Sequence, residues 1–288
     1  MKNRPSILVV VAHYNARAED QLDFLLFQLR DIPAGLPFDI RVVVNQAHPG
    51  PVELARFRPD VEFCYRENTG MNIGAWDFGW RAGQPYDLYV FLQDECLILR
   101  AGWLKQYARR AEGGRIIGES MHGSTPWDEW ERNSRDFWEG LPESEKTKSP
   151  YHSVTYYRDW MIDRGIEPQP TAIHLQSLVL CASRRSLEQI GGFVVPPPDK
   201  HEAIASEIAF SQRAMARGLK VEQVAMLPFH SIIHPQWMGT RSRARTPRAI
   251  IKALVKRYTP RSLVSLLKPG STFARSMKRG SIPQQTKG

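Results

Sequence analysis

The chain has 288 residues, enough for one large α/β domain with a tail or for two small domains. Hydrophobic residues make up 42% of it, which allows a substantial buried core, and 21 Pro and 20 Gly exclude a low-complexity protein. The net charge of +9 is unevenly spread: the last 48 residues hold 13 Lys and Arg and no acid, so the body is mildly acidic and only the tail is strongly basic.

The cysteine pattern argues against both disulfides and structural zinc. Cys64, Cys96 and Cys181 lie in apolar stretches, and none belongs to a CxxC pair or a Cys/His cluster. An odd number of isolated cysteines is typical of a protein from a reducing compartment. The apolar run 7–12 is too short for a secretory signal core, and no run approaches the roughly 20 residues of a membrane-spanning helix. We therefore expect a cytoplasmic protein, either soluble or peripheral to a membrane.

Strands and helices alternate four times in the first hundred residues. Continuous β-branched runs such as 7–12 and 40–44 indicate strands buried on both faces, as in a parallel sheet. Leucines at helical spacing indicate the first helix. The predicted elements here are strands at 7–12, 40–44, 61–65 and 88–92 and helices at 19–30, 52–57 and 72–81. This alternation predicts an α/β fold with a doubly wound, mostly parallel sheet.

Polar residues follow three of these strands. They are the sequences His13-Tyr14-Asn15, Asn45-Gln46 and Gln93-Asp94-Glu95. In doubly wound sheets ligands bind at the carboxyl ends of the strands. The three polar segments are therefore expected to converge on one edge and to form a binding site there.

The second half of the chain reads differently. The stretch 123–170 is irregular, polar and aromatic, and we expect helices near 127–138 and 151–164 within it. A strand at 175–181, a helix at 184–190, a Gly191-Gly192-Phe193 turn, a longer helix at 202–217 and a strand near Val221 follow. Most aromatic rings of 123–170 are expected to form the core of a small helical subdomain, with one or two near an acceptor site.

The basic tail, residues 241–288, contains an amphipathic segment. Between Arg248 and Arg257 the apolar residues share one helical face and lysines lie on the other. Such a segment favours binding to an anionic membrane surface. A disordered solubility tail and nucleic-acid binding are the alternatives, but no nucleic-acid motif accompanies the charge, so no nucleic-acid partner is expected.

The order of these motifs resembles the family 2 glycosyltransferases of the GT-A fold. The resemblance covers about residues 5–237 and depends on an aromatic-Asn pair, an Asn after the second strand, an Asn-x-Gly-x-Asn-x-Gly segment, an acidic strand end, a Gly-Gly-Phe turn, an acid early in a helix and a late His. Two departures stand out. Gln93 replaces the first Asp of the family's Asp-x-Asp, and Ser206 replaces the first acid of its Glu-Asp pair.

The resemblance implies a domain layout and a reaction. The GT-A domain would span 1–238, with a nucleotide-binding half at 1–100 and an acceptor half at 101–238 carrying the insertion 123–170, and the tail would span 239–288. The expected enzyme is an inverting hexosyl- or deoxyhexosyltransferase that uses a nucleotide diphosphate sugar and a glycan or lipid-linked acceptor. Its expected role is cell-envelope polysaccharide synthesis at the inner face of the plasma membrane.

The resemblance also implies the site residues. Nucleotide-sugar binding is expected from Asn15, Asn45, Asn68, Asn72, Gln93 and Asp94. The metal, Mg²⁺ or Mn²⁺, would be held by Asp94, Glu95, His230 and His234, since such ions take carboxylate and phosphate oxygens. The cation would neutralise charge on the departing diphosphate.

A carboxylate base must take the proton of the acceptor hydroxyl. Glu207 matches the family's base position, and Glu202 is a nearby alternative. Glu207 also has a structural interpretation, because acids are favoured in the first turn of a helix. Asn and Gly at 68–74 can simply build a turn, and Trp76 and Trp80, four residues apart, are interpreted as core.

Two other functions remain open at this point. The first is a catalytically degenerate protein that binds a sugar nucleotide or a glycan, an alternative that rests on Gln93 and Ser206. The second is a nucleotidyltransferase on a related sheet. It is weakened by the lack of a phosphate-cradling glycine-rich loop after the first strand.

Overall fold

The computed structural model describes residues 4–123, 125–148, 151, 153–176, 179–197, 199–239 and 242. The chain divides into two compact units, Met1–Met238 and Gly239–Gly288. Apart from Gly239 and Ser242, the second unit lies outside the described residues, and so does the predicted membrane-binding segment of the tail. In the described residues, no helix combines the length and apolar character needed to span a bilayer.

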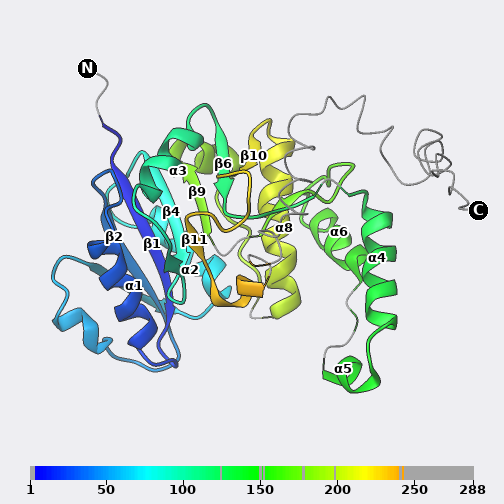
Figure 1. Ribbon diagram of the computed structural model, residues 1–288, viewed down its shortest axis with the longest axis horizontal. Helices are drawn as coiled ribbons and strands as arrows, with labels where there is room; N and C mark the ends of the chain where they lie inside the picture. The colour runs from blue at the N-terminus through cyan, green and yellow to red at the C-terminus, as the bar shows by residue number, and fades with distance from the viewer. Residues whose placement is uncertain are drawn as a thin grey trace, which may run out of the picture. The chain divides into compact units, whose positions relative to one another are not determined.

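The first unit is built on a seven-stranded sheet (Figure 1). In spatial order its strands are β10 (Lys220–Gln223), β6 (Arg115–Gly118), β9 (Val179–Ser183), β4 (Leu88–Gln93), β1 (Ile7–Tyr14), β2 (Asp39–Gln46) and β3 (Glu62–Glu67). All neighbours are parallel except β9, which runs antiparallel to both β4 and β6. The predicted doubly wound, mostly parallel α/β fold is confirmed.

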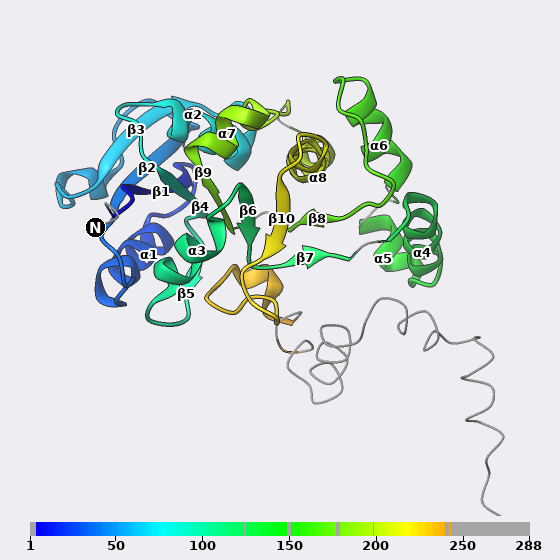
Figure 2. The ribbon, with the colours of Figure 1, turned by 90° about the horizontal axis from the view of Figure 1, so that it is seen from above.

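Helices cover both faces of this sheet. Figure 2 shows α1 and α3 on one side and α2 and α7 on the other. The helices are α1 (Asp20–Asp31), α2 (Met71–Arg81), α3 (Trp103–Ala111), α4 (Trp127–Glu139), α5 (Glu143–Lys148), α6 (Val154–Ile162), α7 (Arg184–Ile190) and α8 (Lys200–Ala216), with 3-10 turns η1 (Glu53–Arg56) and η2 (Pro235–Trp237). Two small antiparallel pairs complete the unit: β5 (Leu97–Ile98) with β11 (Ile232–Ile233), and β7 (Met121–His122) with β8 (His174–Leu175).

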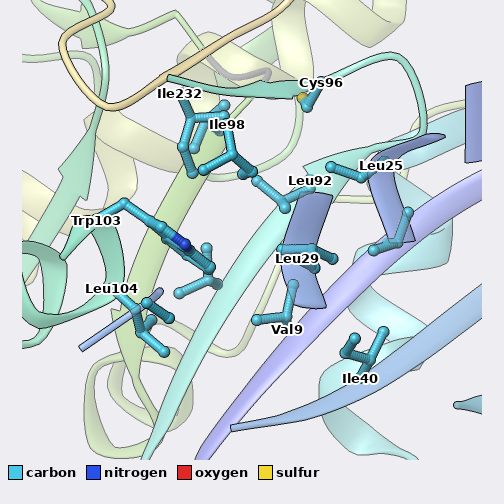
Figure 3. Close-up of a cluster of buried hydrophobic side chains, with 14 of the residues drawn as sticks. Val9, Leu25, Leu29, Ile40, Leu92, Cys96, Ile98, Trp103, Leu104 and Ile232 are labelled. Carbon is cyan, nitrogen blue, oxygen red and sulfur yellow. The ribbon is translucent and has the colours of Figure 1, made fainter. Parts of the chain in front are cut away.

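The β1 strand supplies both cores of the sheet because successive side chains of a strand point to opposite faces. Val9 and Val11 belong to the cluster that α1 and α3 cover, whereas Leu8 and Val10 belong to the cluster under α2. Figure 3 shows the first cluster, where Leu25 and Leu29 of α1 and Trp103 of α3 surround Val9 and Leu92. A continuous apolar run, rather than an alternating one, is required for this position.

The helices α4, α5 and α6 lie at the end of the unit away from β2 and β3 in both views (Figures 1 and 2). Aromatic rings of α4 and α6 form a third core with one face of α8. Trp127, Tyr157 and Trp160 are buried there and Trp130 packs against them, while Phe137 and Tyr156 are exposed. These four rings are half of the eight between residues 123 and 170, so the expectation that most of them build a small helical core holds only in part.

Two predicted elements differ from the structure. The helix expected at 52–57 is the 3-10 turn η1, Glu53–Arg56. The strand expected at 175–181 is wrong in its bounds, because Leu175 pairs with Met121 in β8–β7 whereas Val179 begins β9. The strand β8 belongs to the two-stranded β7–β8 sheet, whereas β9 lies in the main sheet, antiparallel between β4 and β6. The chain therefore passes from one sheet to the other between β8 and β9. Hydrophobic periodicity does not distinguish one long strand from two short ones.

Candidate active site

A cavity of about 280 Å³ opens at the carboxyl ends of β1, β2 and β4. We call it the sheet-edge cavity. Its lining residues are Ala12, His13, Tyr14, Arg17, Asn45, Asn68, Met71, Asn72, Gln93 and Asp94. Most of them come from the ends of these three strands, and the others come from the segment between β3 and α2. The sequence predicts a ligand at this edge of the sheet.

The structure brings together most of the residues expected to bind nucleotide sugar. The members of that set that line the cavity are Asn45, Asn68, Asn72, Gln93 and Asp94. Asn15 does not line it. Its side-chain oxygen accepts a hydrogen bond from the Ala47 backbone N–H (2.6 Å) and its amide nitrogen donates to the His48 carbonyl (2.9 Å). Asn15 therefore ties the loop after β1 to the loop after β2.

Asn45 has a structural task at the wall of the cavity. It is 3% exposed, its amide nitrogen donates to the Met71 carbonyl (2.8 Å), and its oxygen accepts from Arg66 Nη1 (2.7 Å). Arg66 also donates to the Thr69 carbonyl (2.9 Å). This pair shapes the turn at 68–72, whose Asn68 and Asn72 then face the same cavity.

The turn also depends on Gly70. Its φ of +74° is a left-handed conformation that favours glycine. A Cβ at this position would lie only 2.3 Å from Val195 Cγ1, so the loop before α8 packs directly on the turn. On α8, the buried Ser206 donates to the Val194 carbonyl in this loop. Ser206 therefore links the Glu207 segment of α8 to one wall of the sheet-edge cavity.

Three lining residues of the cavity carry buried polar atoms with no hydrogen-bond partner in the described structure. These atoms are His13 Nε2, Asn68 Oδ1 and Asn72 Nδ2. Leaving a buried polar group unsatisfied costs about 1–3 kcal/mol, so native proteins pair nearly all such groups with protein, water or ligand. Other such atoms, for example Trp103 Nε1 and His122 Nε2, lie elsewhere in the described structure, but these three line one cavity, where a polar ligand can pair with them.

His13 and Asp94 form a buried pair at the base of this site. His13 Nδ1 lies 2.6 Å from Asp94 Oδ2, and the two side chains are 0% and 6% exposed. The parallel register of β1 with β4 places Ala12 beside Gln93, and the Asp94 backbone N–H donates to the Ala12 carbonyl (3.1 Å). The sequence places Asp94 among nucleotide and metal ligands, and the structure adds His13 as its partner.

Glu95 points to a different set of partners. Its Oε2 lies 2.9 Å from Arg17 Nη1 and 2.9 Å from His234 Nε2. Burial raises the pKa of Glu95, but the positive charge of Arg17 and the hydrogen bond from His234 outweigh it, so the pKa lies below its ordinary value. Burial lowers the pKa of His234 despite Glu95 beside it. Near neutral pH the pair is a carboxylate with a neutral imidazole, the two forms that ligate metal ions.

The neighbouring strand pair delivers His234 to Glu95. Ile233 and Ile232 of β11 pair with Leu97 and Ile98 of β5, which begins two residues after Glu95. Behind this pair, the buried carboxylate of Glu119 accepts hydrogen bonds from the Tyr107 hydroxyl and from consecutive backbone N–H groups. These are His230 N (2.6 Å), Ser231 N (3.1 Å) and Ile232 N (2.9 Å). Glu119, which the sequence analysis did not single out, therefore holds the segment that ends at His234.

The other predicted metal ligands have different polar partners. His230 Nε2 lies 2.8 Å from Arg100 Nη1. Asp94 is turned to His13. Within the part of the chain that the structure describes, no three His, Cys, Asp or Glu side chains gather as a metal site. Any cation here would have to take further ligands from a bound substrate or water.

The two predicted bases lie on α8. Glu202 has clear structural partners: its Oε2 accepts from Trp160 Nε1 (2.7 Å) and from Arg164 Nη2 (3.2 Å), so it ties α8 to α6. Glu207 is half-buried one turn further along the helix and influences Tyr157 of α6 electrostatically. Glu202 therefore has a structural role at the contact of α6 with α8.

Comparison with known proteins gives structural matches only. No protein-family model and no curated protein matches the sequence. One structural match is the mannosyltransferase PcManGT from Pyrobaculum calidifontis in complex with GDP-Man and Mn²⁺, at 14% identity and a TM-score of 0.48 over 89% of this chain and 65% of that one. Another is GalNAc-T7 with UDP, GalNAc and Mn²⁺, at 12% identity and a TM-score of 0.49 over 77% and 43% of the two chains.

A third match is residues 1–349 of TarS from S. aureus, at 16% identity and a TM-score of 0.41 over 71% of this chain and 55% of that one. This chain thus spans less than two thirds of the length of each of the three proteins. The fold assignment itself rests on the strand order and strand directions of this chain. The chain is similar to these three solved structures, each at a TM-score below 0.5.

Proposed function

We propose that the chain is a metal-dependent, inverting glycosyltransferase that transfers a sugar from a nucleotide diphosphate sugar to a glycan or lipid-linked acceptor. The observation that carries this proposal is the sheet-edge cavity, with unpaired polar atoms inside it and the Glu95–His234 pair beside it. A nucleotide sugar needs both features, because its nucleoside requires directional hydrogen bonds and its diphosphate requires positive charge.

Arg17 connects the two features. It lines the cavity and its guanidinium contacts Glu95. A diphosphate leaving the cavity toward Glu95 would therefore meet a guanidinium, the side chain best suited to phosphate oxygens. Arg17 is half-exposed, which leaves it free to turn from Glu95 to a bound phosphate.

A divalent cation fits the donor set at Glu95. One carboxylate and one neutral imidazole already lie within 2.9 Å of each other, and a diphosphate would add phosphate oxygens. Imidazole is a better ligand for Mn²⁺ than for Mg²⁺, which prefers an all-oxygen shell. Such an ion stabilises the negative charge of a leaving diphosphate. We infer that Glu95 and His234 hold it and that Asp94 and His230 do not.

Glu207 is the base that we propose for the acceptor hydroxyl. Its match to the family's base position and its half-buried place on α8, next to Ser206, support this choice, and Glu202, which accepts from Trp160 and Arg164, is the alternative. Inversion at the anomeric carbon follows if the deprotonated acceptor displaces the diphosphate in a single step, since no second carboxylate is then needed to form a covalent intermediate.

The acceptor and the location are inferred from the tail. Residues 241–288 carry 13 basic and no acidic residues, and 248–257 is amphipathic in sequence. We propose that this tail holds the enzyme at an anionic membrane surface, where a lipid-linked acceptor for cell-envelope polysaccharide is found. Sedimentation with anionic liposomes tests this part alone: deletion of 241–288 should abolish binding to the vesicles, and unchanged binding contradicts it.

The function itself is tested with a panel of UDP-, GDP-, ADP- and CDP-sugars in Mn²⁺, in Mg²⁺ and in EDTA. We expect release of the nucleoside diphosphate from one donor class, and its loss in EDTA. Binding of a donor without turnover on any acceptor would instead favour the sugar-nucleotide-binding alternative. Failure of every donor to bind contradicts the proposal.

The assignment of the base is tested with Glu207→Gln. This change should lower kcat at least about 100-fold while the KM for the donor stays near that of the parent, because a base acts on the acceptor step. Glu143→Gln is the matched control, since Glu143 is exposed on α5. Unchanged turnover in Glu207→Gln removes this residue from the mechanism, and the same assay on Glu202→Gln then tests the alternative.

A further inference from the structure

The sheet-edge cavity combines two kinds of polar group that a phosphate cannot satisfy together. His13, Asn68 and Asn72 each contribute a buried atom without a partner among the described residues. Phosphate oxygens only accept hydrogen bonds, so they leave the Asn68 carbonyl oxygen unpaired. The base and ribose of a nucleoside carry both donors and acceptors, and they match such a mixed set.

The orientation of His13 follows from its contact with Asp94. Asp94 Oδ2 lies 2.6 Å from His13 Nδ1, so these two atoms share a hydrogen bond. The other ring nitrogen, Nε2, has no partner in the described structure and is left for a ligand. A hydrogen bond at Nε2 distinguishes ligands that present a matching polar group at this point from those that do not.

The immediate surroundings of His13 contain few other partners. The residue is 1% exposed and lies at the end of β1, between β2 and β4. Arg17 is the cation among the cavity's lining residues, and its guanidinium is bound to Glu95. The Nε2 atom is therefore left to a ligand that enters the cavity.

We propose that His13, oriented by Asp94, is a specificity-determining residue whose Nε2 forms a hydrogen bond with the nucleoside of the donor, beside Asn68 and Asn72. Asp94 is then a positioning residue for His13 and does not ligate the metal. This inference rests on the proposed function, because it requires that the sheet-edge cavity holds a nucleotide. In this inference Asp94, at the acidic end of β4, acts on the ligand only by orienting His13.

Calorimetry separates the nucleoside contact from the phosphate contact. Titration with UDP, GDP, ADP and CDP in Mg²⁺ identifies the nucleoside diphosphate that the parent binds tightest, and pyrophosphate probes the phosphate part alone. His13→Asn keeps a donor near the position of Nδ1 for Asp94 but has no atom at Nε2. We expect it to bind that nucleoside diphosphate about tenfold more weakly, as for one hydrogen bond, and pyrophosphate as tightly as the parent.

The role of Asp94 is tested by a double-mutant cycle. Asp94→Ala should weaken the binding of the nucleoside diphosphate by a similar factor when it is made in the parent. In the His13→Asn background it should weaken binding by less than twofold, because both changes remove the same contact. Asp94→Asn should retain most of the affinity, since an amide oxygen still accepts from Nδ1. If Asp94 were a metal ligand, both Asp94 variants would weaken the binding of pyrophosphate in Mg²⁺. Their losses in binding free energy would also add fully to the loss caused by His13→Asn.

A measurement on the parent protein makes the test independent of whether the variants fold. Long-range ¹H–¹⁵N spectra should show His13 protonated on Nδ1, and the Nε2 resonance should shift when the nucleoside diphosphate is added but not when pyrophosphate is added. An unchanged Nε2 resonance overturns the inference. His48→Asn, the same substitution at an exposed histidine outside the cavity, is the control and should alter neither affinity.

The outcomes distinguish this inference from the function on which it rests. If the parent binds none of the four nucleoside diphosphates, both are overturned. If the parent binds one and transfers its sugar, while His13→Asn binds it with the parent's affinity, only the inference about His13 is overturned. Equal losses for the nucleoside diphosphate and pyrophosphate also overturn it, because they would show a phosphate contact instead.

Discussion

Two polar clusters of the same molecule contrast sharply. In the helical region, the half-buried Glu131 of α4 accepts from the Tyr151 hydroxyl (2.5 Å), the Ser153 hydroxyl (2.9 Å), the Thr155 backbone N–H (3.1 Å) and Arg135 (3.0 Å). In the sheet-edge cavity, His13, Asn68 and Asn72 each carry a buried atom without a partner in the described structure. The first cluster is complete, and the second is open on one side.

The contrast teaches how to separate structural from functional polar residues. A carboxylate with four hydrogen-bond donors contributes to the stability of the fold, because unfolding breaks all four of its hydrogen bonds. A group left unpaired around a cavity lowers stability until a ligand binds, which is the usual cost of a binding site. Substitutions in the two clusters should therefore act on different measurements.

The largest effect is expected at the rim of the open cluster. Glu95→Gln removes the charge that pairs with Arg17 and His234 and that would hold a cation. We expect kcat/KM for transfer to fall about 1000-fold, roughly 4 kcal/mol, with little change in thermal stability. A steady-state assay in Mn²⁺ measures this, and a loss of less than tenfold would contradict a metal at Glu95.

The next largest effect concerns the anchor behind His234. Glu119→Ala leaves the Tyr107 hydroxyl and three backbone N–H groups of 230–232 without their acceptor. We expect the free energy of unfolding in urea to fall by about 3 kcal/mol. Glu119→Gln should lose less, because its amide oxygen still accepts. Equal losses in the two variants would mean that the packing of the side chain matters more than its hydrogen bonds.

A smaller effect is expected in the complete cluster. Glu131→Gln replaces an acceptor-only carboxylate by an amide whose nitrogen faces donors, and should lower the free energy of unfolding by about 2 kcal/mol without altering nucleotide affinity. Chemical denaturation and calorimetry measure the two quantities. A loss of nucleotide affinity in this variant would break the distinction between the clusters.

The same carboxylate predicts a pH dependence. Burial raises the pKa of Glu131, but its hydrogen bonds with Tyr151, Arg135, Ser153 and Thr155 outweigh this and lower the pKa to about 2, from an ordinary value of 4.5. A lowered folded-state pKa stabilises the fold above the unfolded-state value, and this contribution is lost as the pH falls from about 4.5 toward 2. Stability measured over this range should fall less steeply in Glu131→Gln than in the parent.

The smallest effect on stability is expected from Asn68→Ala. Because Asn68 Oδ1 has no partner in the described structure, its removal should change the free energy of unfolding by less than about 0.5 kcal/mol. The affinity for the preferred nucleoside diphosphate should fall severalfold. Destabilisation by more than about 1 kcal/mol would show instead that Asn68 mainly supports the turn.

The sequence by itself determined the layers of the fold and the edge at which the site forms. The β-branched run that becomes β1 packs on both faces of the sheet, and the leucines of α1 fill one of them, because these patterns depend on local spacing alone. The same logic finds the polar strand ends that line the cavity. In α3 the buried residues Trp103, Leu104, Tyr107 and Ala111 follow the same helical spacing, so this helix is also encoded by a local pattern.

The tertiary structure alone decided which polar side chains meet. Asn15 and Asn45 follow the expected strands, yet both are occupied by loop contacts, while His13 pairs with Asp94, 81 residues away. His234 Nε2 lies 2.9 Å from Glu95 and His230 Nε2 lies 2.8 Å from Arg100, because Glu119 and the β5–β11 pair direct the chain between them. Side-chain hydrogen bonds join residues distant in sequence, and their direction depends on the packed neighbours, which no local pattern encodes.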